Sequence, residues 1–509
     1  MISRLKYLIV VILIYGCGAV QKASESTELY NEPHRPKIHF SPQEAWMNDP
    51  NGMVYYNNRY HLFYQYYPDS TVWGPMHWGH AISKDLVHWE HQPVALYPDS
   101  LGYIFSGGAV VDLHNTSGFG KDGEPPLVAL FTYHDPQGAK TGSITYQTQG
   151  IAYSVDDGKT WIKYANNPVL KNPGIKDFRD PKLIWFESGK KWIMTLAVLD
   201  HIEFYSSPDL KNWTKESDFG KEFGAHGGVW ECPDLFPMKY QDSTVWILVV
   251  NLNPGGPNGG SASQYFTGQF DGNKFIPYQT DTRWLDYGPD EYAGITWSNT
   301  GDRKIFLGWM SNWQYAQVVP TEKWRSAMTI PRDLGLVKVG EKYLVTSRPI
   351  PELNVIEGKA TTLQNIAAAN YDVTEKTGKL AGPARLDITT SILESFTITL
   401  SNDVGEKVLI GYEKTSNNYF LDRTNSGKVS FEKGFAKRHT APRFSSQPKM
   451  DMTLFIDDAS IELFADNGLT TMTQIFFPNT PFTNIKIESA VGFKIDTLQF
   501  RTLKNIWQK

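Results

Sequence analysis

Cysteine is scarce in this chain of 509 residues, which contains two, Cys17 and Cys232. A disulfide framework therefore cannot stabilise the fold, which must depend on the burial of a core. Excess charge is also small, because the formal net charge of -5 is typical neither of a nucleic-acid-binding protein nor of an acidic tail. Aromatic residues, in contrast, make up 14% of the chain. They fit aromatic-rich β structure and a carbohydrate-binding surface equally well.

Long apolar runs are almost absent, except for Tyr7 to Tyr15 near the N-terminus. This run follows basic residues and is too short to span a bilayer, which is typical of a targeting segment. It ends at Gly16-Cys17, and a small residue before a cysteine resembles a bacterial lipoprotein signal. Residues 1–17 are therefore predicted to be a signal segment with lipidation at Cys17, which implies export as a periplasmic or cell-surface lipoprotein. Tyr15 is unusual in such a signal, so plain secretion stays the alternative. Residues 18–36 are polar and are predicted to form a tether.

Sustained helical periodicity is missing from residues 37–351, where short apolar runs are interrupted by Gly, Pro, Asn and Asp, a pattern typical of an all-β fold. A weak repeat recurs at Ser83–Trp89, Ser154–Trp161 and Ser207–Trp213, with a degenerate copy at Phe270–Phe275. Each copy has a turn-forming Asp before an aromatic residue and predicts a β-hairpin. Hairpins recurring at such intervals favour a β-propeller over a sandwich, and loops of a propeller converge on one central funnel.

The pattern changes after Pro351. Residues 352–370 are rich in small residues and are predicted to form a linker. In residues 371–509 apolar and polar positions alternate cleanly, for example in Met452–Ile456 and Ser460–Phe464. The chain is therefore predicted to be all-β, with a propeller followed by a C-terminal β-sandwich. The sandwich carries no cluster of carboxylates, which favours a supporting role or an accessory surface.

Three acidic residues occur in stiff backbone settings. Asp49 precedes Pro50, Asp180 precedes Pro181, and Glu231 stands two residues before Pro233. Proline fixes its own φ and restricts the preceding residue, so these carboxylates are expected on defined backbone at strand entrances. Cleavage of a sugar acetal needs two carboxyl groups on opposite sides of the bond. A propeller would bring such distant residues to one axis.

Signals for a cofactor are weak. The pairs His77/His80 and His88/His91 alternate along expected strands without a third ligand, which does not favour a metal site. The glycine-rich segment 253–260 lacks the lysine and the strand-loop-helix setting of a phosphate loop. Cys232 has no ordered Cys-His pair, so packing is favoured over nucleophilic chemistry. We therefore expect neither a metal nor another cofactor.

Four blocks in order resemble the signature of glycoside hydrolase family 32, the family of invertases, inulinases and levanases. These blocks are Trp46–Gly52, Phe105–Gly107, Phe178–Pro181 and Glu231–Asp234. Ser460–Gly468 also looks like the family's sandwich domain, so the resemblance covers nearly all of the chain after the signal. One block alone is weak, but four in order are specific. The resemblance implies five propeller blades plus a sandwich, with cleavage of fructofuranosyl bonds and retention of configuration.

Roles transfer from the resemblance position by position. Asp49 matches the nucleophile, Asp180 the transition-state stabiliser and Glu231 the general acid/base. Asp180, next to Arg179, is expected to stay ionised. The resemblance also implies a set of residues that line the fructose pocket, with Trp313 at its lip; they are Asn48, Gln65, Trp73, Phe105, Ser106, Arg179 and Trp313.

Three functions are compatible with these residues. The leading one is a retaining hydrolase that releases terminal β-D-fructofuranosyl units from levan and inulin, with sucrose as a further candidate substrate. The second is an endo-acting levanase that releases fructo-oligosaccharides. The third is a non-catalytic fructan-binding surface protein, against which the presence of all three acids argues. The blocks Asp290–Gly294 and Trp309–Ala316 look more like exo-acting members. The expected partner is a fructan, nucleic acid is not expected, and a membrane is contacted only through the lipid anchor.

Overall fold

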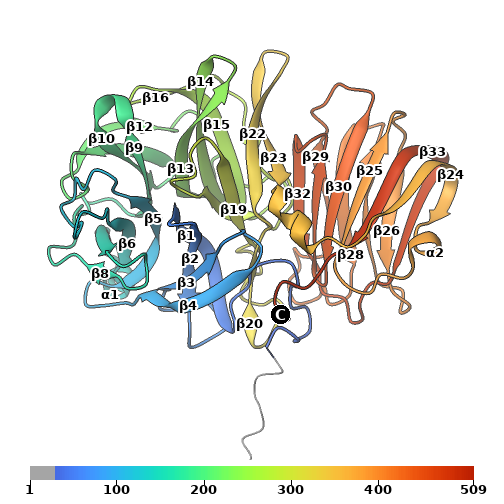
Figure 1. The fold of residues 1–509 in the computed structure, drawn as a ribbon, viewed down its shortest axis with the longest axis horizontal. Helices are drawn as coiled ribbons and strands as arrows, with labels where there is room; N and C mark the ends of the chain where they lie inside the picture. Colours follow the sequence, from blue (N-terminus) through green and yellow to red (C-terminus); the bar gives the residue numbers. More distant parts are fainter. Residues whose placement is uncertain (1–28, 509) are drawn as a thin grey trace, which may run out of the picture.

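The computed structural model describes residues 29–508, and its strands form two units side by side (Figure 1). The predicted signal segment, the lipidation site Cys17 and residues 18–28 of the predicted tether lie outside the described residues. Within residues 29–508, no helix combines the length and the apolar character that crossing a membrane requires.

The first unit consists of five sheets among the described residues, each a blade of a propeller. Blade 1 contains β1 (Ala45–Tyr56), β2 (Arg59–Tyr67), β3 (His77–Ser83) and β4 (Trp89–Leu96), with the short β20 (Trp324–Arg325) parallel to β1. Blade 2 contains β5 (Tyr103–Val111), β6 (Leu127–His134), β7 (Gln147–Ser154) and β8 (Ile162–Lys163). Blade 3 contains β9 (Phe178–Phe186), β10 (Lys191–Val198), β11 (His201–Ser207) and β12 (Thr214–Phe219).

Blades 4 and 5 complete the ring. Blade 4 contains β13 (Val229–Tyr240), β14 (Ser243–Asn253), β15 (Ala262–Phe270) and β16 (Phe275–Pro277), with β17 (Arg283–Trp284) also paired to β15. Blade 5 contains β18 (Tyr292–Thr296), β19 (Lys304–Met310), β22 (Arg332–Val339) and β23 (Lys342–Pro349), with β21 (Ala327–Met328) also paired to β19. The first strands β1, β5, β9, β13 and β18 contact one another in succession, and β18 contacts β1. These five strands therefore surround the axis.

The repeated hairpins are present and share one turn chemistry. In blade 1, the hydroxyl of Ser83 donates to Asp85 at 3.1 Å, and Asp85 Oδ1 accepts the backbone N–H groups of Val87 and His88 at 3.0 and 2.8 Å. In blade 3, Asp209 accepts the same pair of bonds from Lys211 and Asn212, and in blade 2 Asp156 accepts from the Ser154 hydroxyl and from the N–H of Thr160, four residues on. An aspartate that satisfies the turn's own N–H groups stabilises a tight reversal, which explains why the repeat is visible in the sequence.

The second unit is a β-sandwich built from one hydrogen-bonded network that forms two layers. Its strands are β24 (Thr361–Asp372), β25 (Ala384–Thr390), β26 (Phe396–Ser401), β27 (Lys407–Glu413), β28 (Asn418–Asn425), β29 (Arg438–Pro442), β30 (Met450–Asp457), β31 (Ser460–Ala465), β32 (Thr470–Ile475) and β33 (Asn484–Thr502). The long β33 belongs to both layers, because its first part pairs with β26 and its last part with β25.

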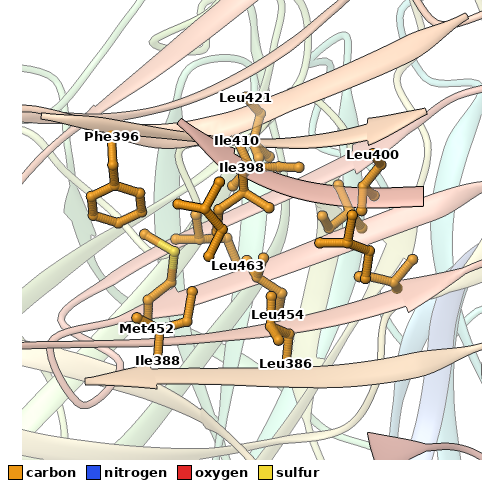
Figure 2. Close-up of a cluster of buried hydrophobic side chains, with 14 of the residues drawn as sticks. Leu386, Ile388, Phe396, Ile398, Leu400, Ile410, Leu421, Met452, Leu454 and Leu463 are labelled. Carbon is orange, nitrogen blue, oxygen red and sulfur yellow. The ribbon is translucent and has the colours of Figure 1, made fainter. Parts of the chain in front are cut away.

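The core of the sandwich lies between these layers (Figure 2). Phe396, Ile398 and Leu400 of β26 come from one layer, and Leu386 and Ile388 of β25 come from the other. Each such side chain that is fully buried contributes about 1.5–3 kcal/mol to folding. The alternation seen in residues 371–509 is therefore that of a sandwich, and the all-β fold prediction is confirmed.

Two predicted connections differ from the structure. The linker expected at 352–370 contains the 3-10 helix η3 (Pro351–Ile356) and most of β24, which pairs with β33. Its many small residues give no clear strand pattern, so the strand that pairs with β33 was predicted as a linker. The end of the expected tether is also not free, because the guanidinium of Arg35 is buried and donates to the backbone carbonyls of Pro42 and Gln43. The remaining helices are short: α1 (Pro136–Thr141), η2 (Glu187–Gly189) and α2 (Thr374–Thr377).

Buried ion pairs connect the two units. Arg332 of blade 5 is fully buried and pairs with Asp286 of the propeller and with Glu462 of β31. His39, near the start of the propeller, contacts Asp457 and Glu462 at 2.8 and 2.9 Å. Burial alone would lower the pKa of His39, but its two carboxylate partners raise it to about 9. Because removing one member of a buried pair is strongly destabilising, these contacts hold the sandwich firmly against the propeller.

Candidate active site

The three acids that the sequence singled out lie in the first strands of three blades, Asp49 in β1, Asp180 in β9 and Glu231 in β13. Each strand loses its regular register at that point. The pairing of β1 with β2 shifts on both sides of Pro50 and Asn51, that of β9 with β10 shifts across Asp180, and that of β13 with β14 shifts after Glu231. Irregularities of this kind bend a strand and redirect its side chains.

Proline explains why the register breaks there. Pro50, Pro181 and Pro233 have no N–H group to donate to the neighbouring strand, so the ladder cannot continue unchanged. Asp180 has a φ of 63°, a left-handed conformation that is costly for a residue with a side chain. The surrounding fold imposes this conformation, and the carboxylate consequently occupies a fixed position.

All ten residues predicted for the site line one cavity of about 340 Å³. They are Asn48, Asp49, Gln65, Trp73, Phe105, Ser106, Arg179, Asp180, Glu231 and Trp313. Five lining residues were not predicted from the sequence: His134, Tyr146, Gln147, Asp177 and Gln317. Distant segments of the chain therefore meet in a single pocket at the propeller axis.

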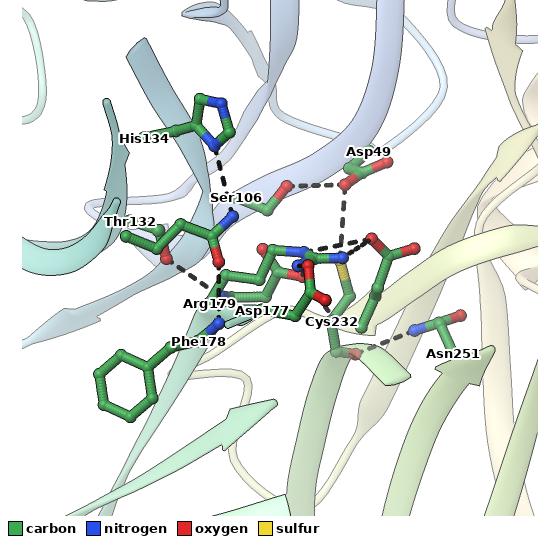
Figure 3. A network of polar contacts seen from close by, with 12 residues as sticks. Asp49, Ser106, Thr132, His134, Asp177, Phe178, Arg179, Cys232 and Asn251 are labelled. Atoms are coloured by element: carbon green, nitrogen blue, oxygen red, sulfur yellow. Dashed lines mark hydrogen bonds and ion pairs between the residues drawn. The ribbon is translucent and has the colours of Figure 1, made fainter. Parts of the chain in front are cut away.

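Several hydrogen-bond donors hold Asp49, and Figure 3 shows two of them, the Ser106 hydroxyl and the Cys232 thiol. The hydroxyl of Ser106 donates to Oδ2 at 2.7 Å, and the amide of Asn48 donates to Oδ1 at 2.9 Å. The indole of Trp46 in turn donates to Asn48 at 2.7 Å, which fixes the orientation of that amide. Burial and the nearby charge of Glu231 raise the pKa of Asp49, whereas the bonds from Ser106 and Asn48 oppose the rise.

Glu231 is oriented by an arginine and a tyrosine. Arg179 donates to Oε1 through Nη2 at 2.8 Å and through Nε at 3.2 Å, and the hydroxyl of Tyr292 donates to Oε2. Arg179 is itself anchored by Asp177, whose Oδ1 accepts from Nη1 at 2.6 Å. A tyrosine hydroxyl can donate to a carboxylate and accept from a carboxylic acid. Tyr292 can therefore stay bonded to Glu231 in both protonation states.

Asp180 departs from the sequence expectation. Burial, followed by the charges of Glu231 and Asp49, raises the pKa of Asp180 to about 7 in spite of Arg179. Arg179 lowers the pKa of Asp180, as expected, but only in part opposes this rise, since the guanidinium bonds to Glu231 and Asp177 and lies 3.8 Å from Asp180. The backbone N–H of Cys232 donates to Asp180 Oδ2 at 3.1 Å, which fixes the carboxyl in place.

Cys232 lies among all three acids, and its thiol donates to Asp49 Oδ2 at 3.5 Å. Burial and the charges of Asp180, Asp49 and Glu231 raise the pKa of this thiol well above its usual range. Because the thiolate is the nucleophilic form of cysteine, such an environment keeps Cys232 unreactive. This agrees with the packing role inferred from the sequence.

Aromatic side chains border the pocket. Trp313 stacks on Trp46 with the ring centroids 5.8 Å apart, and Trp73 meets Phe105 edge-on at 6.0 Å. Indole and phenyl faces suit the C–H surface of a sugar ring, and amides such as Asn48 and Gln65 suit its hydroxyl groups. The lining therefore offers both kinds of contact that a sugar requires.

Two important site residues escaped the sequence analysis. Tyr292 lies in the block Asp290–Gly294, whose only signal in the sequence is its resemblance to exo-acting enzymes. Asp177 stands two residues before Arg179, but nothing in the sequence indicates that its side chain turns back to the guanidinium. Its φ of 52° supplies that turn, and such a conformation is not visible in a sequence.

A metal-ligand geometry occurs away from this pocket. Among the described residues, His201, Glu203 and Asp218 have ligand atoms close enough to share an ion. The ammonium of Lys215 already stands between the two carboxylates, 2.5 Å from Glu203 and 2.7 Å from Asp218. The histidines of the two pairs in the sequence have separate partners, for example Tyr30 for His91 and the Pro75 carbonyl for His77.

Comparison with known proteins identifies the family. Residues 39–348 match the model of the glycosyl hydrolases family 32 N-terminal domain, and residues 352–504 match that of the family 32 C-terminal domain. The chain belongs to glycoside hydrolase family 32. The predicted family is thereby confirmed, and this family 32 chain is a glycoside hydrolase.

Relatives of this family 32 chain act on fructose-containing substrates by name. A levanase of Bacillus subtilis is 43% identical over 99% of this chain and 76% of its own length. An extracellular exo-inulinase of Aspergillus awamori is 40% identical over 91% of this chain and 93% of its own length.

Solved structures match this family 32 chain along nearly all of its length. The crystal structure of the Aspergillus awamori exo-inulinase has a TM-score of 0.87 at 37% identity, covering 94% of this chain and 100% of that one. A β-fructofuranosidase of Schwanniomyces occidentalis, complexed with fructosyl-erythritol, has a TM-score of 0.84 at 32% identity, covering 93% of this chain and 98% of that one. The propeller-plus-sandwich architecture is therefore shared.

Proposed function

We propose that this glycoside hydrolase is a retaining exo-β-fructosidase that releases terminal β-D-fructofuranosyl units from levan and inulin, and also cleaves sucrose. The observation that carries the proposal is the meeting of Asp49, Asp180 and Glu231 in one cavity, with Glu231 held by Arg179 and Tyr292. The relatives named levanase and exo-inulinase support the substrate class. Residues 37–351 are proposed as the catalytic domain and residues 371–509 as the domain that accompanies it.

The first chemical step forms a covalent intermediate. Asp49 attacks the anomeric carbon of the terminal fructosyl unit, and the bond from that carbon to the leaving oxygen breaks. Glu231 gives its proton to the leaving oxygen, so the shortened chain departs as an alcohol. The donors Ser106 and Asn48 fix the carboxylate of Asp49 for this attack. The product of the step is a fructosyl ester of Asp49.

The second step frees the enzyme. Glu231, now a carboxylate, takes a proton from a water molecule while the water oxygen attacks the same carbon. The ester bond to Asp49 breaks, and fructose leaves with its original configuration after two inversions. Asp180 is proposed to hydrogen-bond the vicinal hydroxyls of the sugar more strongly in the transition state than in the ground state, which lowers the barrier.

Substrate contacts are proposed for the predicted lining residues. Asn48, Gln65, Ser106 and Arg179 present amides, a hydroxyl and a guanidinium to a ring of sugar hydroxyls. Trp73, Phe105 and Trp313 present aromatic surface, and Trp313 is proposed to contact the leaving sugar at the pocket lip. No cofactor enters either step.

Exo action is favoured over endo action by the size of the cavity. Its volume of about 340 Å³ is at the low end of the range of roughly 300–1,000 Å³ found for small-molecule sites. A space of this size suits one terminal fructose and part of the next unit better than an internal stretch of polymer. An endo-acting levanase is the second candidate.

Export is proposed together with a lipid anchor at Cys17. The relatives described as extracellular enzymes support export, and the Gly16-Cys17 sequence supports the anchor. Fractionation of cells that produce Cys17→Ala tests the anchor. The variant should leave the membrane fraction, and its retention there would refute lipidation.

Chromatography of the early products from levan, inulin and sucrose tests the function, with Asp49→Asn as the inactive control. Fructose as the first product from each polymer is the expected result. A ladder of oligosaccharides from levan would replace the exo assignment with the endo one. Binding of fructans by a wild-type protein that cleaves none of the three would favour a non-catalytic fructan-binding protein.

A further inference from the structure

A buried arginine of the sandwich reaches into the propeller. Arg423 in β28 is fully buried, and its Nη1 donates to Asp290 Oδ2 at 2.6 Å, while its Nη2 donates to the hydroxyl oxygen of Tyr315 at 2.8 Å. The hydroxyl of Tyr315 donates to the other oxygen of Asp290, which closes a triad of arginine, aspartate and tyrosine. Two members of the triad belong to the propeller and one to the sandwich.

Further contacts from the sandwich hold this triad rigidly. The backbone N–H of Ile475 donates to Asp290 Oδ2 at 2.9 Å. Arg423 Nε donates to the carbonyl of Phe435 at 2.7 Å, and its guanidinium lies 3.7 Å from the centroid of the Phe435 ring. A buried guanidinium with this many partners has one geometry. Asp290 and Tyr315 are therefore held by the sandwich.

The aspartate of the triad is connected to Glu231 through the main chain and the side chain of Tyr292. Tyr292 follows Asp290 by two residues at the start of β18, and its hydroxyl donates to Glu231 Oε2. The main chain between them is short and buried, so a displacement of Asp290 moves the Tyr292 hydroxyl. The position of the sandwich is thereby transmitted to the proposed acid/base.

The tyrosine of the triad is connected to Trp313 at the pocket lip and, through further contacts, to Asp49. Tyr315 closes a turn with Asn312, whose carbonyl accepts the Tyr315 N–H at 3.0 Å, and Trp313 lies within this turn. Trp313 stacks on Trp46, and the indole of Trp46 donates to Asn48, which donates to Asp49. Asn312 also donates to the carbonyl of Pro289 at 2.7 Å, so the two propeller segments are tied to each other beside the triad.

We infer that Arg423 is a positioning residue of the active site, through which the sandwich fixes both the Tyr292 hydroxyl on Glu231 and the Trp313 lip of the pocket. The sandwich is then a working part of the catalytic pocket, and no residue of it needs to touch the substrate. This inference rests on the proposed fructosidase activity for its kinetic test.

Removing Arg423 itself would leave Asp290 buried without its charge partner, which is strongly destabilising. The principal variant is therefore Tyr315→Phe, which deletes one hydroxyl and keeps the Arg423–Asp290 pair. The sandwich offers a matched control, because Arg443, Asp466 and Tyr419 form a second buried triad. There the hydroxyl of Tyr419 donates to Asp466 at 2.7 Å, and Arg443 Nη2 donates to Asp466 at 2.9 Å. Tyr419→Phe makes the same deletion within the sandwich alone.

Both variants should lose similar thermal stability, but only Tyr315→Phe should change catalysis. We expect its kcat/KM on sucrose to fall about three- to tenfold, the effect of one weakened hydrogen bond. The loss should divide between a raised KM, from the shifted Trp313 lip, and a lowered kcat, from the shifted Tyr292 hydroxyl. Arg423→Lys keeps the charge but loses the planar guanidinium that bonds to both Asp290 and Tyr315. It should change kcat and KM in the same directions as Tyr315→Phe does. Tyr419→Phe should keep wild-type kcat and KM.

If Tyr315→Phe matches Tyr419→Phe in kcat and KM, the triad is structural only and the inference fails. Failure of the proposed function would appear differently, as a wild-type protein that cleaves none of the fructosyl substrates. The crystal structure of Tyr315→Phe decides the inference in that case too. A displaced Trp313 ring and a lengthened Tyr292–Glu231 contact support it, and an unchanged pocket overturns it.

Discussion

Ser106 provides the sharpest test of how the pocket controls Asp49. Its hydroxyl donates to Asp49 Oδ2 at 2.7 Å and opposes the rise in pKa that burial and Glu231 produce. A hydrogen bond to a charged group contributes about 1.5–3 kcal/mol, and one pKa unit corresponds to about 1.4 kcal/mol. Ser106→Ala should therefore raise the pKa of Asp49 further, by an energy nearer the lower end of that range because the bonds from Asn48 and from the Cys232 thiol remain.

The sign of the pH effect follows from the role of Asp49. Attack requires the carboxylate, so activity falls as the pH decreases through the pKa of Asp49. A higher pKa moves this acid limb to higher pH. The measurement is kcat/KM on sucrose as a function of pH, because this parameter reports groups of the free enzyme.

The control is Ser298→Ala, which removes a hydroxyl that donates to the backbone carbonyl of Ala109 and not to an acid. This control should leave the acid limb in place. Ser106→Ala could also weaken sugar binding, but that would lower the whole profile without moving it along the pH axis. An acid limb that stays at the wild-type pH in Ser106→Ala would refute the reasoning, because ionisation of Asp49 would then not govern it.

Three further substitutions test other parts of the pocket. Asp180→Asn should abolish measurable hydrolysis yet stabilise the fold above pH 7. The pKa of Asp180 is raised to about 7, so the stability that its protonated form contributes is present at low pH and is lost as the pH rises through that value. The loss is a few kcal/mol at most, at about 1.4 kcal/mol per pKa unit. Thermal unfolding at pH 5 and 8 measures this, and equal shifts at both would contradict it. Asp177→Asn should weaken the 2.6 Å contact that holds Arg179 and lower kcat about three- to tenfold. An unchanged kcat in steady-state assays would show that Glu231 does not depend on this contact. Trp313→Ala should raise KM on inulin and sucrose, and full activity on both would remove this residue from the site.

Much of the architecture was predictable because it depends on interactions between residues that are close in the sequence. The turn aspartates Asp85, Asp156 and Asp209 satisfy backbone N–H groups within two to four residues, so each hairpin is encoded in a short window. The prolines beside the acids similarly mark the irregular strand positions. Recurrence of these windows is sufficient to favour a propeller. The number of blades, in contrast, came only from resemblance to a family.

The rest depends on contacts between segments distant in sequence. Tyr292 and Glu231 are 61 residues apart, and Arg423 and Asp290 are 133 apart. Nothing local distinguishes these side chains from other buried polar residues. The raised pKa of Asp180 was not visible in the sequence for the same reason, since Arg179, its neighbour in the chain, bonds to the distant Glu231. The strand β24 was missed because an exposed edge rich in alanine has little hydrophobic pattern.

The sharing of β33 between the two layers has a consequence for proteolysis. Its two paired parts meet at an exposed joint around Val491, whose side chain is 75% exposed. The neighbouring β24 spans that joint, because Asn370 pairs with Glu488 on one side and Ala368 with Phe493 on the other. A protease that cuts at Val491 would break the chain but leave each half of β33 hydrogen-bonded in its own layer. β24, which pairs with both halves, would still hold them together. The nicked enzyme should therefore stay assembled, as two fragments that separate only in denaturant.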